Sequence, residues 1–192
     1  MAVKSNLINM SLVLTGTCLL CSAILGGAYV LTKEPIDAAA QEKTNRAIGA
    51  VLPAFASAEE AQLELDGKTF HYYKALNGEE TVGYAIESTT VGFGGNLALM
   101  VGITPDGVVY NTSVLSHSET PGLGAKCTTD QKFMAQWKGF DPSVKILTVK
   151  KDGGDVDAIT ASTITSRAYA QAVENALKAF QTLNAEGGQD HE

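Results

Sequence analysis

The sequence predicts an α+β fold: a single N-terminal transmembrane helix, then one domain with a mainly antiparallel sheet and flanking helices. Three observations support this class. An apolar block opens the chain, paired strand-like runs joined by tight-turn residues fill its middle, and helix-like runs flank them. Neighbouring hairpins with helices at the ends are typical of α+β domains. The length of 192 residues suits one domain with appendages.

The first element is a membrane anchor, which we place at residues 9–31, after a cytoplasmic N-terminus of residues 1–8. Residues 10–31 carry no charged side chain, and a helix of that length rises about 33 Å, enough to cross the hydrocarbon core of a bilayer. A cleaved signal peptide is the alternative, with Gly26-Gly27-Ala28 as its cleavage site. The apolar run is longer than the core of a usual signal peptide, which favours the retained anchor.

The residues around the anchor indicate its orientation and a spacer. Lys4 precedes the span, whereas Lys33 is followed at once by an acidic residue, so the positive-inside rule favours the bulk of the chain outside. Residues 32–50 are Ala-rich and polar. We expect a juxtamembrane helix there, with Asp37 as its N-cap and Gly49 as its stop. This helix either lifts the domain off the membrane or packs against partner subunits.

Strand-like runs follow the spacer, and two turn signals pair them into hairpins. Asn77-Gly78 separates the first pair, and Pro105-Asp106-Gly107 separates the second. A fifth run lies later in the chain. The expected strands are Phe70–Ala75, Thr81–Glu87, Leu97–Thr104, Val108–Leu115 and Val144–Val149.

Two helices complete the domain. A short one is expected over Asp130–Trp137. A longer one is expected over Thr165–Leu183, with Thr165 or Ser166 capping its first turn. Residues 185–192 are expected to form a polar tail. The long helix has an apolar stripe at helical spacing, made of Ala168, Ala172, Val173, Ala176, Leu177 and Phe180.

Composition excludes several classes of function. The formal net charge is −7, from 14 basic and 21 acidic residues, and no basic stripe points to nucleic acid. Cys18 and Cys21 lie inside the span, where such cysteines usually serve as small apolar side chains. Cys127 has no partner in the soluble part. The sequence shows neither a metal-ligand spacing nor a convincing catalytic constellation, so we expect no metal and no independent catalytic activity.

The most informative stretch is Asp157–Ser166, a run of small and hydroxyl-bearing residues that opens directly into the last helix. Unpaired backbone N–H groups and the positive end of the helix dipole meet at such a start, which makes it a natural place for a phosphate. The alternative is that these hydroxyl groups, more numerous than one cap needs, only cap the first turn of the helix. Because Ala161 has a Cβ, it is not expected to adopt a positive φ as glycine does.

A second stretch, His117–Gly124, carries a turn beside polar side chains. Pro121-Gly122 favours a type II turn, because proline fixes φ and glycine supplies the positive φ that follows. Gly124 offers backbone that a flat ligand can approach closely. Glu119 and Thr120 add a carboxylate and a hydroxyl beside the turn.

Both stretches resemble the covalent FMN-binding domains of Rnf and sodium-pumping NADH:quinone reductase complexes. Asp157, Thr160 and Thr163 match the acid, the Ser/Thr and the final Thr of that family's flavinylation motif. Ala161 and Ser162 stand where the family usually has Gly and Ala, and Ser162 therefore offers a competing hydroxyl.

The resemblance implies FMN attached to Thr163 through a phosphodiester bond. The second stretch matches the family's block His-x-Glu-Thr-Pro-Gly-Leu-Gly. The residues implied around the flavin are Asp157, Thr160, Ser162, Thr165, Glu119, Thr120, Gly122, Leu123 and Gly124, within an FMN-binding domain at residues 51–184.

The resemblance also implies a role: an electron-carrier component, the G subunit, of a membrane-bound, ion-translocating ferredoxin:NAD oxidoreductase of the Rnf type. Its implied partners are the other membrane subunits and, during maturation, a magnesium-dependent flavin transferase that uses FAD. The implied location is the cell inner membrane, with one pass and the flavin domain on the periplasmic side. Two alternatives stay open: the C subunit of a sodium-translocating NADH:quinone reductase, and a flavin-free, membrane-tethered interaction module.

Overall fold

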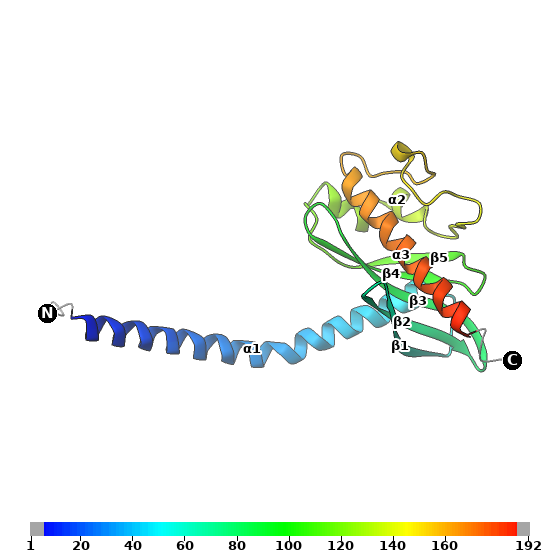
Figure 1. The fold of residues 1–192 in the computed structure, drawn as a ribbon. Helices are drawn as coiled ribbons and strands as arrows, with labels where there is room; N and C mark the ends of the chain where they lie inside the picture. Colours follow the sequence, from blue (N-terminus) through cyan, green and yellow to red (C-terminus); the bar gives the residue numbers. More distant parts are fainter. Residues whose placement is uncertain (1–5, 188–192) are drawn as a thin grey trace. The chain divides into compact units, whose positions relative to one another are not determined.

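The computed structural model describes residues 6–187, so most of the expected cytoplasmic N-terminus and residues 188–192 of the polar tail expected at 185–192 lie outside the described residues. The first three residues of that expected tail are instead the end of the last helix. The chain divides after Glu42 into two compact units. One helix, α1 (Leu7–Val51), runs through this boundary (Figure 1). Within the described part, α1 is the one helix long and apolar enough to cross a membrane, judged by length and composition. Its apolar side chains between Leu7 and Leu31 are exposed.

The expected separate helix after the anchor is wrong, because α1 is continuous. Pro35 lies inside the helix, and Asp37 is an interior residue of α1 and not its N-cap. The helix also continues past Gly49 and ends at Val51. The alanines at positions 38–40 are the strongest helix formers, which explains how the helix persists beyond the proline.

The second unit contains a five-stranded antiparallel sheet in the order β1-β2-β3-β4-β5. This confirms the expected fold class. The strands are β1 (Ser57–Leu65), β2 (Lys68–Asn77), β3 (Glu80–Val91), β4 (Asn96–Ile103) and β5 (Val109–His117). The four runs expected between Phe70 and Leu115 correspond to β2–β5, whereas β1 was not expected.

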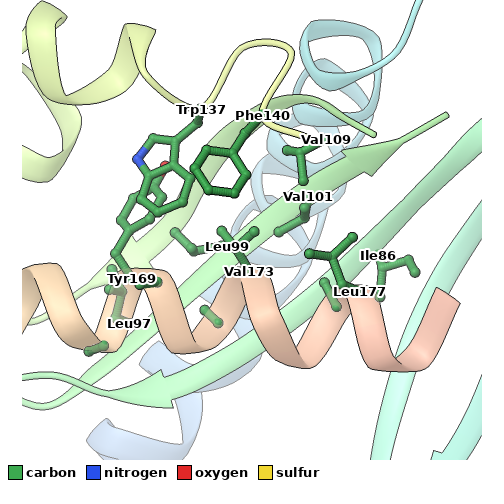
Figure 2. Packing of buried hydrophobic residues seen from close by; sticks show 14 of the residues in the cluster. Ile86, Leu97, Leu99, Val101, Val109, Trp137, Phe140, Tyr169, Val173 and Leu177 are labelled. Atoms are coloured by element: carbon green, nitrogen blue, oxygen red, sulfur yellow. The ribbon is translucent and has the colours of Figure 1, made fainter. Parts of the chain in front are cut away.

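Both faces of the sheet are covered. The long C-terminal helix α3 (Thr163–Gly187) packs on one face, where Leu97, Leu99 and Val101 of β4 meet its apolar stripe (Figure 2). On the other face, Met100 of β4 packs with the last turns of α1, which contribute Ala47, Ile48 and Val51. Coverage on both sides explains why every residue of β4 after Asn96 is buried.

The segment between β5 and α3 contains three short helical pieces and a cluster of aromatic rings. The pieces are η1 (Gly124–Thr128), α2 (Gln131–Ala135) and η2 (Lys150–Asp152). As expected, Asp130 begins α2, and its carboxylate accepts hydrogen bonds from two backbone N–H groups of the first turn. The ring of Trp137 stacks on that of Tyr169 in α3, with centroids 5.0 Å apart, which ties this segment to the core (Figure 2).

The strand expected over Val144–Val149 is wrong. Val144 and Ile146 are 77% and 60% exposed, so this run reaches the core only through Leu147 and Val149. Its backbone is satisfied locally, because the N–H of Ile146 donates to the carboxylate of Asp155 at 2.7 Å. Val149 alone forms a bridge, to Val156.

Candidate functional site

A cavity of about 340 Å³ lies where the segment His117–Gly124 meets the start of α3. It brings together these two segments, which are about 40 residues apart in the chain, and Phe93 from the loop after β3. Thr160, Asp157 and Gly122 do not line it. Its lining residues are Phe93, Glu119, Thr120, Leu123, Gly124, Ala161, Ser162, Thr163, Ile164 and Thr165.

Glu119 links two parts of the cavity wall by hydrogen bonds. Its side chain is 5% exposed, and each carboxylate oxygen accepts one hydrogen bond. Oε1 accepts from the backbone N–H of Phe93 at 2.8 Å, and Oε2 accepts from Oγ1 of Thr165 at 2.9 Å. A Cβ on Gly92 or Gly124 would collide with one or the other of these oxygens. Glu119 therefore connects the loop after β3 to the first turn of α3.

The turn after Glu119 has the expected geometry. The N–H of Leu123 donates to the carbonyl of Thr120 at 3.2 Å, and Gly122 has φ of +77°. Pro121 and Gly122 are therefore the two central residues of the turn, in the order that a type II turn favours. The turn places Leu123 at the mouth of the cavity, where its side chain is 44% exposed.

The loop before α3 departs from expectation at Ala161. Ala161 has φ of +63°, so the expectation that its Cβ would keep it from positive φ is wrong. The N–H of Ser162 donates to the carbonyl of Ile159 at 3.0 Å. This tight turn requires the left-handed residue and turns the chain into the helix.

The expected helix cap is also wrong, because α3 already begins at Thr163. Thr165 and Ser166 lie in its first turn, and both are fully buried. The hydroxyl of Thr165 donates a hydrogen bond to the carboxylate of Glu119. The hydroxyl of Ser166 donates to the carbonyl of Ser162 and accepts from the N–H of Ile159. These hydroxyls therefore stabilise the loop and the helix start.

Among the hydroxyls of this stretch, Thr163 has a distinct position. It is half-buried and lines the cavity, whereas Thr160 is exposed outside it. The side-chain oxygen of Ser162 is buried and has no hydrogen-bond partner among the described residues. Thr163 Oγ1 accepts a hydrogen bond from Nζ of Lys151 at 3.3 Å. Thr163 thus lines the cavity, and its hydroxyl lies beside a cation.

Asp157 fixes the loop from outside the cavity. Its carboxylate pairs with Nζ of Lys150 at 2.8 Å, and the hydrogen bond from Lys150 lowers the pKa of Asp157. The side-chain amide of Gln136 hydrogen-bonds the backbone N–H and carbonyl of Asp157, at 2.8 and 3.1 Å. In the free protein, Asp157 therefore acts as a structural residue of the loop.

Sequence reasoning missed Phe93, Ile164 and Lys151 at this site. The glycines around Phe93 were a signal, since Gly94 lies so close to the backbone of Ser118 that a Cβ would collide with it. Ile164 lies next to a recognised motif residue in the chain. Lys151 has no such signal, because only the fold brings it to Thr163.

These residues fit a flavin mononucleotide. Small-molecule sites range over about 300–1,000 Å³ and are mostly apolar, with a few polar groups that set orientation. The mouth of this cavity is apolar, with Phe93 70%, Ile164 50% and Leu123 44% exposed. The lining also includes the start of α3, where the first N–H groups of a helix have no intrahelical partners and favour an anion. A flat ring at the mouth and a phosphate at the helix start match this arrangement.

Comparison with known proteins agrees with the fit. A family model described as FMN-binding domain matches residues 92–178. The chain is 35% identical to the G subunit of the proton-translocating ferredoxin:NAD(+) oxidoreductase complex of Clostridium ljungdahlii, over 88% of this chain and 89% of that protein. It is 34% identical to the G subunit of the ion-translocating oxidoreductase complex of Methanosarcina acetivorans, over 81% of this chain and 85% of that protein.

A solved structure shares the fold. The crystal structure of the C subunit of Na(+)-translocating NADH-quinone reductase from Parabacteroides distasonis aligns with a TM-score of 0.52 at 19% identity, covering 74% of this chain and 83% of that one. The two G-subunit relatives match at higher identity over most of their length. The chain therefore belongs to the G-subunit family of ion-translocating (Rnf) oxidoreductase complexes and contains that family's FMN-binding domain.

Proposed function

We propose that this protein is an electron-carrier subunit of a membrane-bound, ion-translocating ferredoxin:NAD oxidoreductase and that it holds FMN through a phosphodiester to Oγ1 of Thr163. The observation that carries this proposal is the position of Thr163. This residue lines the cavity, at the start of a 25-residue helix, and its hydroxyl lies beside Lys151. The competing hydroxyls of Ser162 and Thr165 are buried, and that of Thr165 already donates to Glu119.

Attachment requires a group transfer from FAD, catalysed by a separate flavin transferase. Oγ1 of Thr163 forms a bond to the flavin-side phosphorus, and the bond from that phosphorus to the AMP moiety breaks. The hydroxyl proton leaves to a base of the transferase, AMP departs, and nothing is oxidised or reduced. Small residues at 161 and 162 leave room for the transferase, and Thr163 needs no activation from a base of its own chain.

FMN, when bound, supplies the electron-transfer chemistry, and the chain supplies position. Glu119 fixes the walls of the cavity, and the apolar mouth formed by Phe93, Leu123 and Ile164 covers part of a flat ring. We place the protein in the inner membrane through the apolar part of α1, with its second unit on the outer, periplasmic side. A covalent bond keeps the cofactor on a side where free flavin would diffuse away.

The test uses the full chain purified from its own host. We expect a denatured band that fluoresces under ultraviolet light and an intact mass raised by one FMN less one water, mapped to the peptide that contains Thr163. Thr163→Ala should lose both signals and keep its melting temperature, whereas Thr163→Ser should keep both, because it retains the acceptor oxygen.

Covalent flavin that persists in Thr163→Ala would move the attachment to another hydroxyl. A wild-type chain without flavin, from a host that makes the transferase, would refute the carrier role and favour a flavin-free interaction module. Co-purification with the other subunits of a NADH:quinone reductase would instead assign the protein to that complex.

A further inference from the structure

We propose that Lys151 is the counter-ion of the phosphate at Thr163: its ammonium group positions the phosphate during attachment and pairs with the phosphodiester afterwards. This inference rests on the proposed function. Lys151 lies in η2, 12 residues before Thr163, and its Nζ donates to Oγ1 of Thr163 at 3.3 Å. No motif of the sequence contains it.

The first argument is that Lys150 and Arg167, two cations close to Lys151, are already paired. Nζ of Lys150 contacts the carboxylate of Asp157 at 2.8 Å. Arg167 makes two hydrogen bonds to Asp152, from Nε at 2.6 Å and from Nη2 at 2.7 Å. These pairs neutralise both cations before any ligand arrives.

Lys151 differs from both neighbours. Within the described residues, it has no carboxylate at ion-pairing distance, and its one side-chain hydrogen bond goes to the Thr163 hydroxyl. It is exposed, so its ammonium group is available to an anion that approaches Thr163.

The second argument is that the backbone of Lys151 is held in place from both sides. Lys150 is bound through its side chain to Asp157, and its N–H donates to the carbonyl of Val156 at 2.9 Å. Asp152, the next residue, is bound to Arg167 of α3. The stem of Lys151 therefore starts from a fixed point next to the helix, which lowers the entropic cost of placing its charge.

The third argument comes from the chemistry of the product. A phosphodiester carries a negative charge, and the N-terminus of α3 offers N–H groups to it but no full positive charge. Lysine is a common phosphate ligand that acts as a point charge. Before attachment, the same ammonium donates to the oxygen that loses its proton, and a donor fixed at that oxygen stabilises the charge that develops on it.

The test measures attachment by the flavin transferase, with FAD and Mg²⁺, on full-length protein purified without flavin. Lys151→Met removes the charge and keeps much of the side chain, whereas Lys151→Arg keeps the charge. Lys138→Met is the matched control, since it removes an exposed lysine from the turn after α2. We expect Lys151→Met to slow attachment about tenfold or more, as the loss of a charge-assisted hydrogen bond predicts. Lys151→Arg should recover most of the rate, and Lys138→Met should match the wild type.

Two readouts on the product separate pairing from a structural role. The ³¹P resonance of the phosphodiester should shift in Lys151→Met and lie near the wild-type position in Lys138→Met. In the wild type, an amine-reactive label should modify Lys151 more slowly once Thr163 carries the flavin, with Lys138 as the internal reference. The labelling needs no variant, so it decides the question even if Lys151→Met does not fold.

The outcomes distinguish this inference from the proposed function. A flavinylated wild type with equal attachment rates, ³¹P resonances and labelling would overturn the role of Lys151 and leave the attachment at Thr163 intact. A wild type that is never flavinylated would overturn both.

Discussion

Replacing Ala161 by glycine should stabilise the protein. Ala161 has φ of +63°, and an L-residue in the left-handed region costs about 1–2 kcal/mol. Glycine removes this cost but adds about 0.4–1 kcal/mol of conformational freedom to the unfolded chain. The midpoints of these ranges leave a gain of about 0.8 kcal/mol in the free energy of unfolding. For a domain of this size, that gain raises the melting temperature by about 2–3 °C.

The assay is urea or thermal unfolding of the full chain in detergent, followed by circular dichroism. Ala135→Gly is the matched control, because Ala135 is exposed, is the last residue of α2 and does not have a positive φ. There the same substitution should destabilise, by up to about 1 kcal/mol, because glycine is a poorer helix former than alanine. The two substitutions are therefore expected to change the free energy of unfolding in opposite directions. If Ala161→Gly destabilises the protein as Ala135→Gly does, Ala161 does not occupy the left-handed region and the turn into α3 is misassigned.

Substitutions at three further positions test the site and the core. Glu119→Leu should cost about 1–3 kcal/mol in urea unfolding, because it leaves the N–H of Phe93 and the hydroxyl of Thr165 without their acceptor; an unchanged unfolding midpoint would contradict the two hydrogen bonds of Glu119. Gly122→Val should alter the flavin spectrum and cost about 1–2 kcal/mol, since φ is +77° there and a β-branched residue disfavours it. Gly122→Asn should do less harm, and equal effects would count against the turn. Burial and then the charge of Glu119 raise the pKa of the Cys127 thiol from 9.0 to about 11. Between these values the unfolded chain loses a proton that the folded chain keeps, so the free energy of unfolding should fall as pH rises through that window. Cys127→Ala should make this fall shallower, and an identical pH profile in that variant would refute the assignment.

The sheet was largely predictable because its hairpins are local. Asn77-Gly78 and Pro105–Gly107 mark turns, and the apolar runs beside them become β2–β5. β1 was missed because only Leu63 among its residues is buried. An edge strand with one solvent-facing side and many polar residues has little apolar signal, and it forms because β2 offers hydrogen-bond partners.

The error over Val144–Val149 has the opposite cause. Val, Ile and Leu gave a strand signal, but the sheet already ends at β5 and no strand of the described residues pairs with this run. The segment lies instead beside the aromatic cluster, with Val144 and Ile146 exposed. Intrinsic β-propensity could not reveal that this run has no strand partner in the fold.

The site was predictable where a motif carried it and unpredictable where the tertiary fold supplied it. The resemblance pointed to Thr163 and Glu119, and both line one cavity. The contacts that define the role of Glu119 join it to Phe93 and Thr165, which are 26 and 46 residues away in the chain. Such pairings depend on how α3 packs against the sheet, which local patterns do not encode.

The packing of α3 also bears on the proposed electron transfer. The hydroxyl of Tyr169 lies 2.7 Å from Oγ1 of Thr112 in β5, and its ring stacks on Trp137. The start of α3 is thus fixed to the sheet and to the connecting segment within two turns of Thr163. A flavin attached there would have its phosphate on a rigid element, whereas its ring would lie among exposed apolar side chains such as Phe93. Rigidity at the phosphate keeps the ring within a fixed reach, and exposure at the ring lets a partner approach it closely, which is what a carrier that both accepts and passes electrons requires.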